Sequence, residues 1–595
     1  MRRSTVQESR IIRNAFYLQL GAYVFSQMTR MIGSIVDGVM IGRFLGVDSI
    51  AAFGIVSPAL VVFSIFGMLI SIGSRNLFTR FIGEGKLDEA RGIFSLSLIV
   101  SAAGSVMLMT VTLAFATPIA ALLGASGNAA HLLPKARDYL IGISIGLPAL
   151  NLIHVMNNYF PIDNDRRLPV YSSITLTVTD ILMDVLMIFA FHGDMFEMGL
   201  ATSISYYAAF AVLLLHFRKK EIILHPSFRH LSWGELPRIA AKGLPSSIYL
   251  VGYLVTVAFM NRLLAVNASA SAIAAYSVCM QAQEILCILT VGIGDTTAVI
   301  AGILLGEENR PQMKKLLKTS VRATLIITLA SSAVSFFGAH AFSSLYIVGN
   351  AEALRLSIRA VRAYAVGIPL YGLSLVYFNY FQGIGKTALS SVCSFLSEVV
   401  TLILSALVLS VWFKEDAPWF AFPVAQILMF LIYTCLVVTN DRKNRGKRSF
   451  WDKILLLPDS FDVPESDRID ISISTIEEIT EYAQIIGDFC LSHGCESRRA
   501  NHMRHAVDEM AGNVFEHGFS KDNKKHTIDV RAVKKGDDYI LRIRDDCYIF
   551  DPVHQLQLLY PDDLFRNIGV RLIMKTAKDV QYTSILKLNN LVVRI

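Results

Sequence analysis

Four polar side chains inside long apolar segments are the residues of this sequence best suited to chemistry. Asp37 lies in SIVDGVMIGRFLG, Asp180 and Asp184 lie in TVTDILMD, and Thr202 lies in GLATSIS. A carboxylate in hydrocarbon is costly, so such groups face a cavity or a partner. Asp180 and Asp184 are four residues apart and therefore project from one face of a helix. Oxygen ligands suit Na⁺ and crowded carboxylates favour H⁺ uptake, so we expect a cation- or proton-coupling site, or else a structural polar cluster.

The second half of the chain carries two further carboxylates in apolar runs, Glu284 and Glu398. Spacing does not define their role, and each is either a second acidic site or a structural group. No GxxxxGK[ST] phosphate-binding loop occurs in the sequence, which disfavours an exporter driven directly by ATP.

The elements that must position these residues are membrane-spanning helices. The chain has 595 residues, of which 53% are hydrophobic and 17% charged. The charged fraction is about 12% in residues 1–440 and about 32% in residues 441–595, so a membrane part precedes a water-soluble part. We predict twelve spans, near residues 15–42, 50–79, 93–116, 138–160, 170–191, 196–217, 245–266, 274–303, 323–346, 362–382, 389–412 and 418–439.

The distribution of lysine and arginine predicts the orientation of these spans. About 27 basic residues, Arg75 among them, are assigned to one set of span ends, against about 7 on the opposite side. Basic residues accumulate on the cytoplasmic side, so we expect a multi-pass protein of the cytoplasmic membrane with both termini in the cytoplasm. The net charge of +7 is concentrated beside the membrane, which favours the lipid bilayer and excludes nucleic acid as a partner.

Matching segments six spans apart indicate an internal repeat. GEGKLDEAR (83–91) corresponds to GEENRPQMKK (306–315), and GISIGLPAL (142–150) corresponds to AVGIPLYGL (365–373). Six is an even number, so both halves enter the membrane in the same orientation, an arrangement typical of transporters with a path between the halves. We therefore expect a first transmembrane lobe over residues 1–220 and a second over 221–440.

Several of these segments carry a resemblance to a known family. VDGVMIGRFLGVDSIAAFGI (36–55), GEGKLDEAR, YLIGISIGLPAL (139–150), AAKGLPSSIYL (240–250) and NYFQGIGKTALS (379–390) resemble the multidrug and toxic compound extrusion (MATE) transporters. The resemblance implies alternating access of two lobes and efflux of organic, often cationic, compounds by Na⁺ or H⁺ antiport. It places the coupling site at Asp37, Asp180, Asp184 and Thr202, although Asp180 stands where the family pattern has asparagine.

After a basic linker over 441–464, the pattern changes to that of a small α+β two-layer sandwich over 465–595. DRIDISIS, TIDVRAV (527–533) and DYILRIR (538–544) alternate polar and apolar residues as strands do. A capping box at residues 474–477 predicts a helix to about 493, and a second helix is expected over 497–517. QYTSILKL and LVVRI are expected to form a hairpin with its turn at Asn589 and Asn590.

The second helix contains DEMAGNVFEHG (508–518), in which Glu509 and Asn513 share one face. With IRDDCYIFDP (543–552) and NIGVRLIMKTAKDVQY (567–582), it resembles the histidine-kinase-like ATPases, particularly the anti-sigma-factor serine/threonine kinases. The resemblance implies ATP and Mg²⁺ as cofactors, with Asn513 on the metal, Glu509 as catalytic base, Asp545 on adenine and Gly569 at the phosphates. Cys547 departs from the family's glycine, and the glycine-rich lid is thin.

These observations together predict an all-α polytopic membrane protein of twelve helices in two lobes, followed by an ATPase-like domain. The expected function is secondary active efflux, with a tail that regulates transport and contacts a cytoplasmic regulatory protein. The alternatives are a membrane-anchored sensor with serine/threonine kinase activity and a flippase for lipid-linked substrates. A flippase would have a large cationic central cavity.

Overall fold

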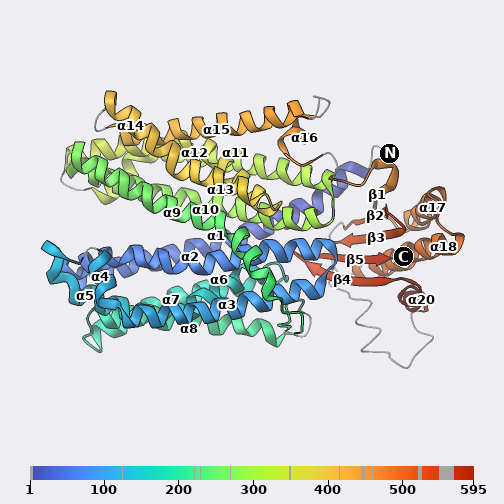
Figure 1. Cartoon of the computed structure of the whole chain (residues 1–595), viewed down its shortest axis with the longest axis horizontal. Coiled ribbons are helices and arrows are strands. Elements are labelled where there is room, and N and C mark those ends of the chain that lie inside the picture. The colour runs from blue at the N-terminus through green and yellow to red at the C-terminus, as the bar shows by residue number, and fades with distance from the viewer. Residues whose placement is uncertain are drawn as a thin grey trace.

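The computed structural model describes residues 4–123, 125–219, 222–227, 229–267, 270–347, 350–413, 416–443, 449–458, 461–519, 526–547 and 568–595. Figure 1 shows two groups of long helices lying side by side and a small sheet with three helices at one end of them. We call the helical part the bundle, residues 465–595 the tail, and the end of the bundle next to the tail the tail-side end.

The first lobe of the bundle comprises α1 to α8. Its elements are α1 (Ser4–Met40), the π-helical turn η1 (Ile41–Leu45), α2 (Val47–Glu84), α3 (Leu87–Ala114), α4 (Ala116–Leu123), α5 (Leu133–Ser144), α6 (Leu147–Tyr159), α7 (Arg167–Phe189) and α8 (Met195–Leu214). The start of α8 shows why helices begin where they do: Asp194 and Glu197 form a capping box, in which the Asp194 N–H donates to Glu197 Oε2 at 2.8 Å.

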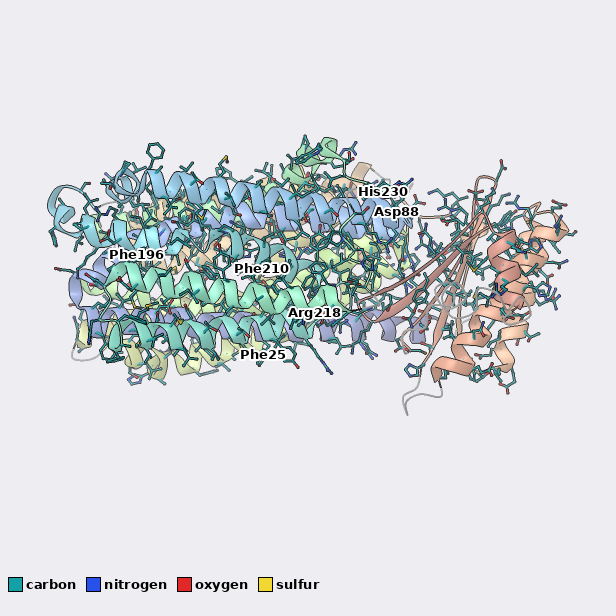
Figure 2. The ribbon with its side chains drawn as sticks, turned by 90° about the horizontal axis from the view of Figure 1, so that it is seen from below. Phe25, Asp88, Phe196, Phe210, Arg218 and His230 are labelled. Atoms are coloured by element: carbon teal, nitrogen blue, oxygen red, sulfur yellow. The ribbon has the colours of Figure 1, made fainter. Side chains whose placement is uncertain are left out.

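The second lobe comprises α9 to α15, and a short helix follows it. Its elements are α9 (Leu236–Asn267), α10 (Ala270–Gly306), α11 (Arg310–Tyr346), α12 (Ala351–Gly383), α13 (Thr387–Phe395), the π-helical turn η5 (Leu396–Val400), α14 (Thr401–Phe413), α15 (Ala417–Lys443) and α16 (Phe450–Ile454). In Figure 2, Asp88 and His230 lie at the tail-side end, whereas Phe196 lies near the opposite end.

Among the described residues, ten helices are long and apolar enough to cross a membrane, or eleven if the pair α5 and α6 forms one span. These two helices meet at a 50° bend. Pro148, in the first turn of α6, has no N–H to continue the hydrogen bonding of α5 across this point. Helix α1 occupies the position predicted for the first span, and many of its side chains lie outside the described residues.

The predicted internal repeat is visible in the backbone of four turns at the tail-side end. Gly85 and Glu308 occupy matching positions of the two lobes, as do Asn164 and Gly385, and all four have positive φ angles, between 51° and 76°. In each turn, the N–H of the following residue donates to the carbonyl five residues earlier, at 2.8 to 3.1 Å. The two lobes therefore end their helices by the same left-handed closure, even where glycine is absent.

The lobes touch backbone to backbone near the tail-side end. A Cβ added at Gly83 of α2 would collide with the carbonyl of Ile303 in α10, and one at Gly306 would collide with the carbonyl of Arg80. Gly73 packs in the same way against Ile239 of α9. Only glycine permits so close an approach, so the passage between the lobes is closed at this end.

The tail is an antiparallel five-stranded sheet in the order β1-β2-β3-β5-β4, with three helices on one face. Its elements are β1 (Arg468–Ile473), α17 (Glu477–Ser492), α18 (Ser497–Gly518), β2 (Ile528–Lys535), β3 (Asp538–Asp545), α20 (Ile568–Thr576), β4 (Asp579–Ile585) and β5 (Leu588–Arg594). This arrangement confirms the predicted two-layer sandwich.

Alternate residues of β2 and β3 point to opposite faces of this sheet. The apolar set joins the core beneath the helices and includes Ile528, Val530, Ala532, Leu541 and Ile543. The other face turns Arg531, Arg542 and Arg544 toward the bundle. Buried guanidinium groups need partners. Arg531 has one within the tail, Asp470 of β1 at 3.3 Å, whereas Arg542 and Arg544 find acceptors in the bundle.

The predicted position of the last hairpin turn is wrong. Strand β5 begins at Leu588, so Asn589 and Asn590 lie inside it, and the turn is formed by Leu586 and Lys587 with φ of 56° and 59°. Ile585 and Leu586 are buried in the apolar core of the bundle. The burial of these side chains, together with the pairing of the strands, outweighs the turn preference of two consecutive asparagines.

The predicted capping box also differs in detail. Helix α17 begins at Glu477, one residue after Ile476, which offers no capping side chain. Glu478 instead reaches back to accept the backbone N–H groups of Ser474 and Thr475, at 2.7 and 3.2 Å. The helix end is thus satisfied by a glutamate one position later than expected.

Candidate functional site

Helices α1 and α7 bring three carboxylates together in the first lobe. One oxygen each from Asp37, Asp180 and Asp184 lies within 4.8 Å of the others. Asp180 and Asp184 are 3% and 1% exposed, and Asp37 is half-buried. The helices approach closely at Gly33, where an added Cβ would lie 3.6 Å from Thr177 Oγ1. The small residue thus allows the two helices to carry their acidic groups into one cluster.

Several oxygens of this acidic cluster have no hydrogen-bond donor. Asp37 Oδ1 and both carboxylate oxygens of Asp184 are buried and have no partner among the side chains that the structure describes. Asp180 Oδ1 accepts from the Ser205 hydroxyl at 3.1 Å. Buried carboxylate oxygens without donors are costly, and a bound Na⁺ or proton removes that cost. The donor set, hard oxygens only, fits either cation.

Two hydroxyls of α8 lie at the cluster, those of Ser205 and Thr202, and both interact with Asp180. Thr202 is buried on α8, and its hydroxyl donates to the Met198 carbonyl of its own helix at 3.4 Å. Ser205 lies three residues later, on the same face as Thr202. Sequence reasoning missed Ser205, although the i,i+3 spacing from Thr202 in TSIS was the signal that could have found it.

The second lobe has one described carboxylate of the predicted pair. Glu398 is 3% exposed in the π-helical turn η5 and borders a cavity of about 40 Å³ with mostly apolar and aromatic walls. Its backbone carbonyl accepts from the Thr256 hydroxyl. The side chain of Glu284, in α10, lies outside the described residues. Glu398 does not join an acidic cluster among the residues that the structure describes.

Arg75 and Asp295 form an ion pair between the lobes that was not predicted from the sequence. Arg75 of α2 is 3% exposed and lies inside the helix, a position that its assignment to a span end did not anticipate. Its Nη2 is 3.1 Å from Oδ1 of Asp295 in α10, and its Nη1 donates to Asn158 Oδ1 at 2.6 Å. The pair borders a cavity of about 210 Å³ between the lobes. The signal was Asp295 itself, an acid within the apolar run VGIGDTTAV.

We expect Asp295→Asn to weaken closure at the tail-side end. The change leaves the Arg75 guanidinium buried beside an uncharged amide, a loss of about 3 kcal/mol. Pulsed electron resonance between spin labels on the tail-side ends of α3 and α11 should therefore report longer distances. The exposed Asp88→Asn is the matched control and should change nothing, and adding Arg75→Gln to Asp295→Asn should shorten the distances again. Unchanged distances in Asp295→Asn would contradict a role for the pair in closure.

In the tail, two of the predicted site residues, Glu509 and Gly569, are in contact. Glu509 and Asn513 are one turn apart on α18. Gly569, in the first turn of α20, lies against Glu509, because a Cβ added there would be 2.8 Å from Glu509 Oε1. A carboxylate at the start of a helix is favourable because the N-terminal N–H groups point toward it.

Asp545 lies at the end of β3 and is 3% exposed. Its Oδ1 accepts from Asn589 Nδ2 at 2.7 Å and from the Cys547 N–H at 2.9 Å. Burial raises the pKa of Asp545 to about 6, and these two hydrogen bonds oppose the rise. Cys547 is buried against the end of α18, where a Cβ added at Gly518 would lie 2.8 Å from Cys547 Cβ. The predicted lid region between β3 and α20 lies outside the described residues.

The arginine face of the tail contacts the second lobe of the bundle. Arg544 pairs with Glu307 at the end of α10 and donates to Gln312 Oε1 at 3.0 Å. The side chains of Arg544 and Glu307 are 10% and 2% exposed. Lys535 pairs with the neighbouring Glu308 at 2.8 Å, at a more exposed position.

The tail also contacts the first lobe. Arg542 donates to the Gly83 carbonyl at 2.8 Å, and the Leu586 N–H donates to the Ile162 carbonyl at 3.1 Å. Asn164 donates to Ser584 Oγ at 2.8 Å, within the turn that follows α6. The sheet therefore bridges the tail-side ends of both lobes.

Comparison with known proteins gives two family matches. Residues 22–186 and 244–407 match the MatE family model, once in each lobe, and residues 474–595 match the model of the histidine kinase-like ATPase domain. The chain is 23% identical over 429 residues to the probable multidrug resistance protein YoeA of Bacillus subtilis, covering 69% of this chain and 90% of that one. It is 21% identical over 382 residues to the multidrug export protein MepA of Staphylococcus haemolyticus, covering 64% and 83%.

Solved structures of low sequence identity share the fold of the bundle. The Vibrio cholerae MATE transporter VcmN, in its bent form, matches with a TM-score of 0.67 at 16% identity, over 75% of this chain and 98% of that one. An outward-facing multidrug resistance MATE family transporter of the MOP superfamily matches with a TM-score of 0.66 at 18% identity, over 71% and 94%.

Proposed function

Because the chain belongs to the MatE family over both lobes of its bundle and ends in a histidine kinase-like ATPase domain, we propose that it is an ion-coupled exporter of small organic cations regulated by its tail. The family membership confirms the resemblances predicted from the sequence motifs. It makes the chain a multi-pass membrane protein of the multidrug efflux type. The coupling ion, the class of substrate, the role of the tail and the cytoplasmic position of both termini belong to the proposal.

The observation that carries the coupling proposal is the set of buried oxygens without donors at Asp37 and Asp184. Together with Asp180, these carboxylates repel one another in the absence of a cation. A Na⁺ or a proton that enters the cluster removes the repulsion between α1 and α7. Cation entry therefore stabilises one packing of these helices over the other, which changes the populations of the two lobe arrangements.

Alternating access requires the closed end of the bundle to open. The contacts to be broken there are the glycine contacts of α2 with α9 and α10 and the Arg75–Asp295 pair. In the proposed cycle, the cluster takes up a cation while this end is closed. The substrate, bound between the lobes on the previous opening, leaves toward the other side as the cation enters.

The test is transport by the whole chain in reconstituted vesicles under an imposed Na⁺ or pH gradient, with and without ATP. Efflux of an organic cation driven by either gradient without ATP supports secondary transport and identifies the ion. A requirement for ATP hydrolysis would contradict it.

For the tail, we propose regulation through its contacts with both lobes. The sheet contacts Gly83 and Asn164 of the first lobe and Glu307 and Glu308 of the second. Relative motion of the lobes at this end must break or rearrange some of these contacts. A nucleotide, or a cytoplasmic regulatory protein, that alters the tail would thereby alter the balance between the two lobe arrangements.

The nucleotide site proposed for the tail uses Glu509, Asn513, Asp545 and Gly569. ATP fits this donor set in part: Asn513 would hold Mg²⁺, Asp545 would accept from the adenine amino group, and the start of α20 at Gly569 would face the phosphates. Bound ATP would supply a phosphoryl group to the hydroxyl of an acceptor protein, with ADP as the leaving group, and Glu509 would take the proton of that hydroxyl. Glu509 lies against Gly569, so this carboxylate must move aside when phosphates bind.

We expect nucleotide affinity to increase with pH through the pKa of Asp545. With this pKa near 6, the ionised form that accepts from adenine rises from about one tenth at pH 5 to about nine tenths at pH 7, which is roughly a tenfold gain in affinity. Fluorescence titration of the full-length protein in detergent with an ATP analogue measures it. Asp545→Asn should remove the pH dependence, whereas the exposed Asp537→Asn should keep it.

The same raised pKa has a consequence for stability. The folded tail holds a proton on Asp545 between about pH 4 and pH 6 that the unfolded chain releases, so this group makes folding less favourable as pH rises through that window.

Nucleotide binding that stayed constant between pH 5 and 7 would contradict the assignment of Asp545 to adenine.

The two alternatives predict different results in the vesicle experiment. A membrane-anchored sensor kinase would show no gradient-driven flux and would transfer phosphate to a protein. A flippase for lipid-linked substrates would need a cationic central cavity. The cavity at Arg75 pairs its arginine with Asp295, which favours the exporter.

A further inference from the structure

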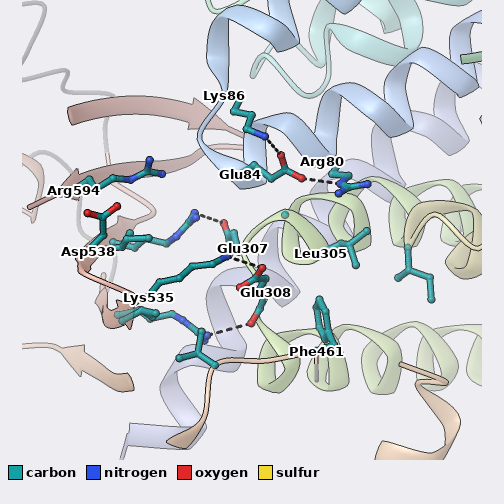
Figure 3. Close-up of a pocket in the computed structure, with 17 residues that line it drawn as sticks. Arg80, Glu84, Lys86, Leu305, Glu307, Glu308, Phe461, Lys535, Asp538 and Arg594 are labelled. Carbon is teal, nitrogen blue, oxygen red and sulfur yellow. Dashed lines mark hydrogen bonds and ion pairs between the residues drawn. The ribbon is translucent and has the colours of Figure 1, made fainter. Parts of the chain in front are cut away.

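A cavity of about 790 Å³ lies where both lobes, the linker and the tail meet (Figure 3). The first lobe contributes the end of α2, the second lobe the end of α10, and the tail the bundle-facing side of β2, β3 and β5. The helix-side site with Glu509, Asn513 and Gly569 lies on the other face of the same sheet. This junction cavity is therefore separate from the proposed nucleotide site.

The walls of the junction cavity carry an excess of positive charge. Six basic side chains border it, against four acidic ones. The basic ones are Arg80, Lys86, Arg531, Lys535, Arg542 and Arg594, and the acidic ones are Glu84, Glu307, Glu308 and Asp538. Four of the basic groups come from the tail and two from the first lobe. Arg531 is already paired with Asp470 and Asp462, outside the cavity, at 3.3 and 3.6 Å. The other basic groups still face the space from two sides.

The carboxylates of the junction cavity are already engaged. Glu84 pairs with both Arg80 and Lys86, at 2.8 and 2.7 Å. Lys535 forms an ion pair with Glu308, and Lys578, which lies outside the cavity, forms one with Asp538. Glu84 supplies one negative charge for two positive side chains, Arg80 and Lys86, so one positive charge is left uncompensated there.

Arg594 supplies the donor that a ligand would use. Its Nε is buried and has no hydrogen-bond partner within the described part of the chain. Figure 3 shows the Arg594 side chain on the wall of the cavity, near Asp538. Arg542, on the neighbouring strand, is 3.4 Å from Glu307 through a buried Nη1 that makes no hydrogen bond. A guanidinium with N–H groups that lack acceptors is well suited to bind phosphate, because two phosphate oxygens can accept two of its N–H groups at once.

We propose that the junction cavity binds a small anion carrying several phosphate groups. Donors for such an anion come from two different walls, Arg594 on the tail and the Arg80–Lys86 group on the first lobe, and about 790 Å³ is large enough for a polyanion the size of a nucleotide. The phosphates come either from a soluble molecule or from a lipid head group at the membrane surface. A polyanion held between the tail and the end of α2 fastens the first lobe to a tail that Arg544 already pairs with Glu307 of the second lobe. It therefore favours the arrangement in which all three parts meet and opposes opening at this end.

The test is isothermal titration of the full-length protein in an uncharged detergent with inorganic tripolyphosphate. The variants are Arg594→Gln and Lys86→Gln, which change two different walls, and the matched control is Arg498→Gln, an exposed arginine on α18. Each cavity variant should weaken binding at least tenfold, and the control should bind as the unaltered protein does. No binding by the unaltered protein, or equal binding by both cavity variants and the control, would overturn the proposal.

Two further arms locate the anion and its source. Asn513→Ala should leave tripolyphosphate binding unchanged, and a tenfold loss in this variant would place the anion in the helix-side site and overturn the proposal. The titration is then repeated in nanodiscs of cardiolipin, whose head group carries two phosphates, and of phosphatidylglycerol, an anionic lipid with one phosphate, at matched surface charge. Weaker tripolyphosphate binding in cardiolipin than in phosphatidylglycerol identifies lipid phosphate as the occupant, and equal binding identifies a soluble one.

Discussion

Asp37→Asn should reduce gradient-driven efflux by about 100-fold, the factor that corresponds to about 2.7 kcal/mol of lost differential binding. The side chain keeps its size and loses the charge that makes the cluster with Asp180 and Asp184 attract a cation. Without that charge, cation entry no longer favours one packing of α1 against α7. The measurement is efflux of an organic cation from vesicles under each imposed gradient.

The acidic cluster offers sharp controls for this result. Asp184→Asn should reduce efflux as strongly as Asp37→Asn, because both carboxylates carry oxygens without donors. Asp88→Asn removes a carboxylate that is 59% exposed at the tail-side end and should transport normally. Full ion-coupled efflux by Asp37→Asn would show that the cluster is a structural group, and the coupling proposal would then be wrong.

Arg544→Leu should release the tail from the bundle. Glu307 has a side chain only 2% exposed, and without Arg544 its charge retains only the longer contact to Arg542. Leaving a buried charge poorly paired costs about 3 kcal/mol, so the undocked population should rise by roughly 100-fold. Hydrogen exchange at the end of α10, from Leu305 to Asn309, measures this directly, and the regulatory proposal predicts a changed transport rate in the same variant.

Two variants separate the loss of the Arg544–Glu307 pair from general damage. The double variant Arg544→Leu/Glu307→Leu removes both charges and should recover most of the docking, since apolar side chains tolerate the buried position. Lys535→Gln breaks the exposed pair with Glu308 and should change docking by less than about 1 kcal/mol. If the double variant exchanges as fast as Arg544→Leu alone, the buried charge is not what holds the tail.

Local pattern predicted much of the architecture. The apolar runs and the two pairs of repeated segments were sufficient for two lobes of like orientation, because hydrophobic length and turn sequence are properties of short stretches. The matching left-handed turns at Gly85 and Glu308 carry that repeat into the backbone. The alternation in TIDVRAV and DYILRIR likewise predicted strands, whose pairing then followed from a short loop.

The errors fall where distant parts of the chain compete with local preference. Asn589 and Asn590 are good turn residues, yet Asn589 is buried in β5 and donates to Asp545. The turn lies at Leu586 because the bundle buries that side chain. The Arg75–Asp295 pair was not predicted, since its two members are 220 residues apart in the chain.

What the sequence determined by itself is the inventory: membrane helices in two related halves, a soluble α+β tail, and acids in hydrocarbon that require an explanation. These follow from transfer free energies and backbone periodicities that each segment carries alone. Only the tertiary structure decided which charges meet. The family resemblance had grouped Asp37 with Asp180 and Asp184, but the Arg75–Asp295 pair and the contact of the arginine face with Glu307 depend on helix and strand packing. Electrostatic partners are chosen by distance in space rather than along the chain.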